Sequence, residues 1–159
     1  MPGYGLATIY EDHPVGHEFT VANLPLHLTH VDSFEINLEA DELAAKLTHA
    51  LAGQKALEAR ALPDKLYGPD KDILVTPLEL TPELTRLHGE IIELLKKEGA
   101  ILKNPHFNGD SFTPHVSVYG AKRVKTGELV PIKDISLSTK VSEAEDANRR
   151  VLANFELSS

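Results

Sequence analysis

Two patterns of apolar and polar positions recur along this chain. Residues 24–32 and 112–120 alternate between apolar and polar side chains. Such alternation predicts strands, because successive side chains of a strand point to opposite faces of the sheet. Leu43, Leu47 and Leu51 instead recur every four residues, which predicts a helix over 41–52.

A second helix is predicted after residue 80. Thr81 suits the N-cap position and Pro82 the first helical position, where its missing N–H costs no hydrogen bond. One apolar stripe follows, formed by Leu84, Leu87, Ile91, Leu94 and Leu95. Two lysines and then a glycine follow that stripe, and both are typical of a helix C-terminus. The helix should therefore run from about residue 82 to 97.

The remaining apolar runs predict further strands, in residues 6–10, 72–80, 100–103, 129–140 and 150–157. Pro77 interrupts the second of these runs, which suggests a sheet edge or a bulge there. We expect an α+β fold of two pseudo-symmetric lobes, with largely antiparallel sheets, one helix per lobe and a central cleft. Residues 1–159 should form a single bilobal domain.

Composition narrows the possible functions. The 159 residues include no cysteine, so disulfides and cysteine nucleophiles are excluded. No apolar stretch approaches the ~20 residues of a membrane span, and no signal peptide is visible, so we expect a cytoplasmic protein without membrane contact. The net charge of −8 argues against long non-specific binding to nucleic acid. We also expect a monomer.

Two short strings share one form. His27-Leu28-Thr29 and His115-Val116-Ser117 each read histidine, apolar residue, hydroxyl. On a strand, the imidazole and the hydroxyl of each string share one face. Chance gives roughly one such string in a chain of this composition, so their matched context carries the argument. Two acid/base groups and two hydrogen-bond donors suit cleavage of a phosphodiester.

These strings and their surroundings resemble the 2H phosphoesterase superfamily, which includes 2'-5' RNA ligase-like proteins and cyclic nucleotide phosphodiesterases. The runs PLHLTHV and FTPHVSVYG look like its two motifs, including the proline before the second histidine. The resemblance extends over roughly residues 5–157. His30 departs from the pattern, because the family usually has an apolar residue at that position.

The resemblance implies a metal-independent phosphodiesterase, or a reversible ligase, that acts on 2',3'-cyclic phosphates or on 2'-5' linked nucleotide or RNA ends. His27, Thr29, His115 and Ser117 would then be the catalytic residues, with no metal and no cofactor. The partner would be a small nucleotide, a cyclic nucleotide or an RNA terminus. The residues alone do not say which histidine is the acid and which the base.

Aromatic residues flank the second string. Tyr119 shares the face of His115 and Ser117 in an ideal strand, so it is the first candidate for a contact with a base or ribose. Phe112 is a second candidate for substrate binding, although aromatic residues here are more typical of a core. Residues 104–113 are a candidate rim of the cleft. Within them, His106 and Asp110 are a weaker alternative as metal ligands.

Basic residues gather after the second string, at Lys122, Arg123, Lys125 and Lys133. A solvated hairpin is the more ordinary interpretation of this group than a phosphate-binding patch. Two other functions stay open: a binding module that holds a nucleotide or RNA end without turnover, and a structural domain in which the two strings are coincidental.

Overall fold

The computed structural model describes residues 2–105, 112–144 and 146–159. This part of the chain contains two α-helices, Ala40–Ala50 (α1) and Pro82–Lys97 (α2), and a short 3-10 turn at Val21–Asn23. Its strands are Gly3–Ile9 (β1), Glu18–Phe19 (β2), His27–Glu35 (β3), Leu57–Arg60 (β4), Lys65–Tyr67 (β5), Ile73–Pro77 (β6), Ile101–Leu102 (β7), His115–Ser117 (β8), Leu129–Ile132 (β9), Asp134–Lys140 (β10) and Arg149–Glu156 (β11).

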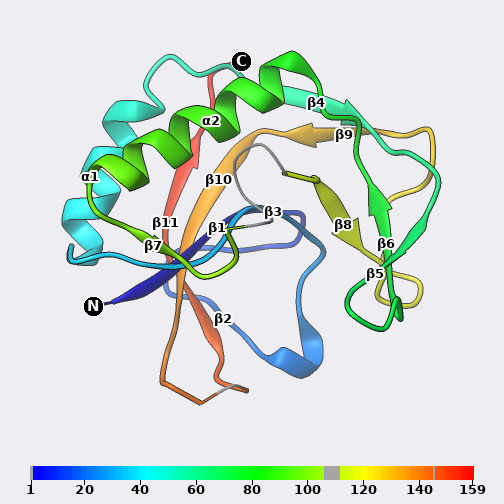
Figure 1. Cartoon of the computed structure of the whole chain (residues 1–159), viewed down its shortest axis with the longest axis horizontal. Coiled ribbons are helices and arrows are strands. Elements are labelled where there is room, and N and C mark those ends of the chain that lie inside the picture. Colours follow the sequence, from blue (N-terminus) through cyan, green and yellow to red (C-terminus); the bar gives the residue numbers. More distant parts are fainter. Residues whose placement is uncertain (1, 106–111, 145) are drawn as a thin grey trace.

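Antiparallel pairing joins most of these strands into one large sheet. Its order is β2-β11-β10-β1-β3-β8-β6-β5, and β7 pairs with the far end of β3. A separate pair, β4 and β9, lies beside the large sheet (Figure 1). Strand β3 therefore lies near the middle, between β1 of one half and β8 of the other. This position matters because β3 and β8 carry the two histidine strings.

Two clusters of buried side chains form the interior. The first lies under both helices and contains Leu43 and Leu47 of α1 together with Leu87 and Ile91 of α2. The second lies under β8, β4 and β9, and Leu84 in the first turn of α2 belongs to it. The predicted α+β class with largely antiparallel sheets is confirmed. The two helices are shared unevenly between the two clusters, because both pack side by side on the first (Figure 1).

Local signals account for the starts of both helices. Helix α2 begins after Thr81, whose hydroxyl accepts a hydrogen bond from the N–H of Leu84 at 3.1 Å. Helix α1 begins one residue earlier than the apolar period indicates, because Glu39 and Glu42 form a reciprocal capping box. None of the described helices is both long and apolar enough to cross a membrane.

Two predicted strands differ from the structure in more than their bounds. The run over 72–80 was expected to form an edge or a bulge at Pro77, but β6 lies between β5 and β8 and simply ends at that residue. A proline at a strand end removes no ladder hydrogen bond from the interior. The run over 129–140 divides after Ile132 into β9 and β10, which belong to different sheets.

Candidate functional site

The two histidine strings face each other across neighbouring strands. Leu28 of β3 pairs with Val116 of β8 in antiparallel register. Extending this register by one residue each way sets His27 opposite Ser117 and Thr29 opposite His115. Directly opposed residues of an antiparallel pair have Cβ atoms about 5 Å apart and share one face. Each imidazole therefore lies across from the hydroxyl of the other string.

The floor beneath these four side chains is apolar and rigid. Leu28 and Val116 point to the opposite face, where both side chains are fully buried in the second cluster. The four polar residues are each only partly buried. Strict alternation on two central strands thus fixes both the direction and the spacing of the polar group.

Both imidazoles are oriented by the same contact. Nδ1 of His27 donates a hydrogen bond to the carbonyl of Pro25 at 2.8 Å, and Nδ1 of His115 donates to the carbonyl of Thr113 at 2.8 Å. A carbonyl only accepts, so in each neutral ring the proton lies on Nδ1. Nε2 is then the nitrogen of each ring that can take up or deliver a proton.

The electrostatic surroundings of the two rings differ. Burial lowers the pKa of His27 below its usual range, and the hydrogen bond to Pro25 opposes that shift. The nearby His115 and Arg149 lower the pKa further, and the carboxylate of Glu11 raises it by a smaller amount. Burial also lowers the pKa of His115, but the hydrogen bond to Thr113 and the carboxylate of Asp32 act in the opposite direction. The charge that acts on His115 is thus negative and favours its protonated form, whereas at His27 the two positive groups each act more strongly than the negative Glu11.

Each histidine lies beside a tyrosine. The rings of His27 and Tyr119 are stacked with centroids 6.5 Å apart, so the structure brings Tyr119 to the motif residues. Tyr67 of β5 meets His115 edge-on at 4.9 Å. Phe112 is placed elsewhere: it is buried in the second cluster, where it stacks on His88 at 3.8 Å.

Other residues at the site were not found by sequence reasoning. Tyr67 lies in a three-residue strand whose periodicity is too short to indicate a face. Asp32 and Ser33 follow the first string on β3, but two β-bulges between β1 and β3 break the alternation that would have placed them. His106 and Asp110, with most of the candidate rim, lie outside the described residues.

Two of the basic residues after the second string are already paired. Nζ of Lys122 lies 2.7 Å from a carboxylate oxygen of Glu11, and Nη2 of Arg123 lies 2.8 Å from one of Asp64. These pairs fit the ordinary interpretation of the group as a hairpin that faces solvent. Within the described ranges, no cluster of three or more histidine, aspartate or glutamate side chains could hold a metal ion.

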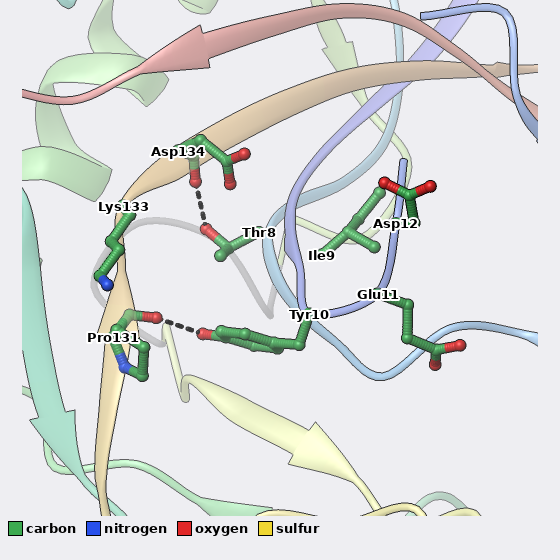
Figure 2. A pocket seen from close by; sticks show the side chains of 8 residues that line it. All are labelled: Thr8, Ile9, Tyr10, Glu11, Asp12, Pro131, Lys133 and Asp134. Carbon is green, nitrogen blue, oxygen red and sulfur yellow. Dashed lines mark hydrogen bonds between the residues drawn. The ribbon is translucent and has the colours of Figure 1, made fainter. Parts of the chain in front are cut away.

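A hollow of about 390 Å³ is lined by none of the four motif residues, although Ile9 in its lining pairs with His27. It is lined by Thr8, Ile9, Tyr10, Glu11, Asp12, Pro131, Lys133 and Asp134 (Figure 2). Inside it, Tyr10 donates a hydrogen bond to the carbonyl of Pro131 at 2.8 Å and Thr8 donates to that of Asp134 at 2.7 Å. These bonds connect the end of β1 and the residue after it to β9 and β10. The hydroxyls of Thr8 and Tyr10 therefore already donate to the protein backbone.

Sequence comparison identifies the family. The profile of the 2'-5' RNA ligase superfamily matches residues 11–130, which include both histidine strings. The chain belongs to the 2'-5' RNA ligase superfamily. This result confirms the resemblance to 2H phosphoesterases. Among curated proteins, none matches the sequence significantly.

Solved structures of this superfamily's fold resemble the chain over its whole length. Escherichia coli LigT complexed with 3'-AMP is 16% identical, covers 99% of both chains and gives a TM-score of 0.59. A protein of Thermus thermophilus is 15% identical, with coverage of 98% of this chain and 97% of its own and a TM-score of 0.58. A protein described as a phosphoesterase is 16% identical, covers 99% of both chains and gives a TM-score of 0.56. At these identities, the likeness shows the fold of a LigT-like protein.

Proposed function

We propose that this member of the superfamily is a metal-independent phosphodiesterase for 2',3'-cyclic phosphates or 2'-5' linkages of nucleotide or RNA ends. The observation that carries the proposal is the in-register opposition of two His-x-hydroxyl strings, each ring held by the same backbone contact. Membership of a superfamily of phosphoesterases and ligases supports an enzymatic function in general.

In the proposed reaction, one neutral imidazole takes a proton from water through Nε2. The water oxygen attacks phosphorus, the bond to a ribose oxygen breaks, and the other imidazolium delivers a proton to that leaving oxygen. Thr29 and Ser117 donate hydrogen bonds to the non-bridging oxygens, where negative charge increases in the transition state. Ligation is the same path in reverse, with the two proton transfers exchanged.

We assign the acid to His115 and the base to His27. Asp32 favours the imidazolium at His115. Arg149 and His115 itself favour the neutral ring at His27. A pair of titratable groups whose environments separate their pKa values is the arrangement that acid/base catalysis requires.

The proposed partner is a small nucleotide. Crystal structures of LigT with 3'-AMP, NADP+ and ATP show that this fold accommodates nucleotides of several sizes. In this chain, the ring of Tyr119 beside His27 offers a surface on which a base or ribose can stack. The net charge of −8 supports a ligand of this size over a long nucleic acid.

A direct assay tests the proposal. The protein is incubated with 2',3'-cyclic AMP and with a 2'-5' linked diadenylate in the presence of EDTA, and products are separated chromatographically. Turnover of either substrate, lost in His27→Ala, supports the enzyme. Binding without turnover would indicate a nucleotide-binding module instead of an enzyme. If the protein neither binds nor turns over these substrates, both functions are contradicted. Activity that disappears in EDTA and returns with a divalent ion would contradict the metal-independent mechanism.

A further inference from the structure

One arginine side chain extends across the large sheet. Arg149 begins on β11, its Nη1 donates a hydrogen bond to Oγ of Ser138 on β10 at 3.3 Å, and its Nη2 donates to Oγ of Ser33 on β3 at 3.0 Å. Strand β1 lies between β10 and β3. The guanidinium therefore bridges strands that are two positions apart in the sheet, passing over Gly5 of β1.

A glycine makes this path possible. A Cβ atom added at Gly5 would lie 3.2 Å from Nη1 of Arg149, closer than an ordinary van der Waals contact. Tyr4 and Leu6 on either side point into the first cluster, so a side chain at Gly5 would project from the opposite face. The guanidinium occupies the space that this missing side chain leaves.

This face is also the face of the histidine strings. Ala7 lies two residues beyond Gly5 and pairs directly with Thr29. Tyr4 pairs with Phe34 and Leu6 with Val31, so Gly5 lies opposite the bulged residues Asp32 and Ser33. Thr29 and Ser33 are four residues apart, which corresponds to roughly 13 Å along a regular strand, and the bulges shorten this distance.

The Arg149 charge is unpaired among the described residues. Its hydrogen bonds are to two neutral hydroxyls, whereas Arg123 is paired with Asp64 and Arg150 with Glu18. A guanidinium has five N–H donors in a planar fork that matches phosphate oxygens. The carboxylate of Asp32 is nearby, but it accepts hydrogen bonds from the Ser33 backbone N–H and from Asn104.

We propose that Arg149, aided by the hydroxyls of Ser33 and Ser138, binds a second phosphate group of the substrate, separate from the one between His27 and His115. This inference rests on the proposed phosphodiesterase function and narrows its substrate class. The preferred substrate then carries at least one phosphate besides the reacting one. That phosphate belongs either to the 5' position of the same nucleotide or to the next phosphodiester of an oligonucleotide.

Three substrates distinguish these sources. They are adenosine 2',3'-cyclic phosphate, its 5'-phosphorylated form, and a diadenylate whose 3' end carries the cyclic phosphate. Charge-assisted hydrogen bonds predict a kcat/KM at least roughly 10-fold higher for one of the last two. Arg149→Met should remove that preference, so that the ratio of kcat/KM between the preferred substrate and the plain cyclic nucleotide falls to about one. Any effect of the substitution on the pKa of His27 is common to the three substrates and cancels in this ratio. A preference for the 5'-phosphorylated form would assign the first source, and a preference for the diadenylate the second.

Arg150→Met is the matched control, because Arg150 is the next residue of β11 and is paired with Glu18 at 2.9 Å. It should keep the full preference. Gly5→Ala adds a methyl group under the guanidinium and should weaken the preference in part, which tests the site without removing its charge. Thermal unfolding verifies that each variant is folded.

The inference is overturned if the wild-type protein shows no preference, or if folded Arg149→Met keeps it. If none of the three substrates is turned over, the proposed function fails instead. Calorimetric titration with 5'-AMP and with adenosine then tests separately whether Arg149 binds a phosphate group. Tighter binding of 5'-AMP by the wild type, lost in Arg149→Met, supports the anion site, and equal binding of the two ligands contradicts it.

Discussion

The side chains of the candidate site differ in how far the sequence could predict them. His27, Thr29, His115 and Ser117 were predictable, because in two strings of the same form, each on a strand with alternating side chains, the histidine and the hydroxyl must share one face. Asp32 and Arg149 were not. Asp32 lies within the bulged part of β3, and Arg149 reaches the site from the last strand across two others. Neither position has a local pattern that indicates its direction.

Removing a hydroxyl tests its role in the transition state. Thr29→Val keeps the shape and the β-propensity of the side chain, and Ser117→Ala removes only the donor group. If each stabilises charge on the phosphate, kcat should fall on the order of 10²-fold for each variant, with smaller effects on substrate binding. The double variant should lose less than the product of the two single losses, because both donors serve one phosphate.

Steady-state kinetics together with thermal unfolding measure this effect. Thr85→Ala, on the exposed side of α2, serves as a control that should keep full activity. A stable Thr29→Val protein with wild-type kcat would show that Thr29 is only a strand residue.

The carboxylate of Asp32 should set one limb of the pH–rate profile. The acid His115 must be protonated and the base His27 neutral, so kcat/KM should follow a bell-shaped curve. Burial lowers both pKa values, which places the decline on the alkaline side below the pH range of an ordinary imidazole. Asp32→Asn removes the charge that raises the pKa of His115, so that decline should move to still lower pH.

The acid limb reports His27 and should stay where it is in Asp32→Asn. Asp41→Asn, at the exposed start of α1, is the control and should leave both limbs unchanged. A profile of Asp32→Asn identical to that of the wild type would contradict the assignment of His115 as the acid.

At the scale of elements, the helices, the long strands and two of the short strands, β7 and β8, were predictable, whereas β2 and β5 were not. Helix α2 carries an N-cap, a proline, a stripe and a C-terminal glycine, so both of its ends are marked in the sequence. Strands β2 and β5 have two and three residues, which are too few for a period to appear. The division of residues 129–140 between two sheets depends on tertiary pairing, which local sequence does not encode.

His30, which stands where the family usually has an apolar residue, is buried at the contact between β3 and α2. Its hydrogen bonds explain how a polar side chain is accommodated there. The Thr8 hydroxyl donates its proton to the carbonyl of Asp134, so it must accept from Nε2–H of His30 at 2.7 Å. Nδ1 of His30 is then unprotonated, buried and without a partner among the described residues. His88 of α2 donates to the carbonyl of His30 at 3.0 Å. A second proton on His30 would have no acceptor.

This contact predicts acid sensitivity of the folded state. Burial lowers the pKa of His30 from 6.5 to about 3. Between these values the unfolded chain binds a proton that the folded chain excludes, so the free energy of unfolding should decrease as the pH falls from about 6.5. The decrease from this one group approaches roughly 5 kcal/mol near pH 3. The pKa values of His27, His88 and His115 are also lowered in the folded chain, so these groups add to the decrease with the same sign.

Urea unfolding at several pH values between 7.5 and 4.5 measures this dependence. His30→Leu should flatten it, whereas His49→Gln at an exposed position of α1 should not. An unchanged slope in a folded His30→Leu protein would exclude His30 as the main source.

For the whole molecule, the pairing of β3 with β8 has two structural roles. It connects the half of the sheet that lies under the helices to the half that carries β5 and β6, and it brings the two histidine strings into register. The α+β class was predictable from the order of helices and strands. The shared core under both helices was not, since the sequence does not say which face a helix covers.

The central claim is that His27 and His115 act together on one phosphate. The most direct test is the initial rate of hydrolysis of a 2',3'-cyclic nucleotide, with EDTA present, for His27→Ala, His115→Ala and the exposed control His49→Ala. Each of the first two should lose ~10²–10⁴-fold in kcat while remaining folded, and the control should keep its activity. Near wild-type turnover by a folded His27→Ala or His115→Ala protein would contradict the account.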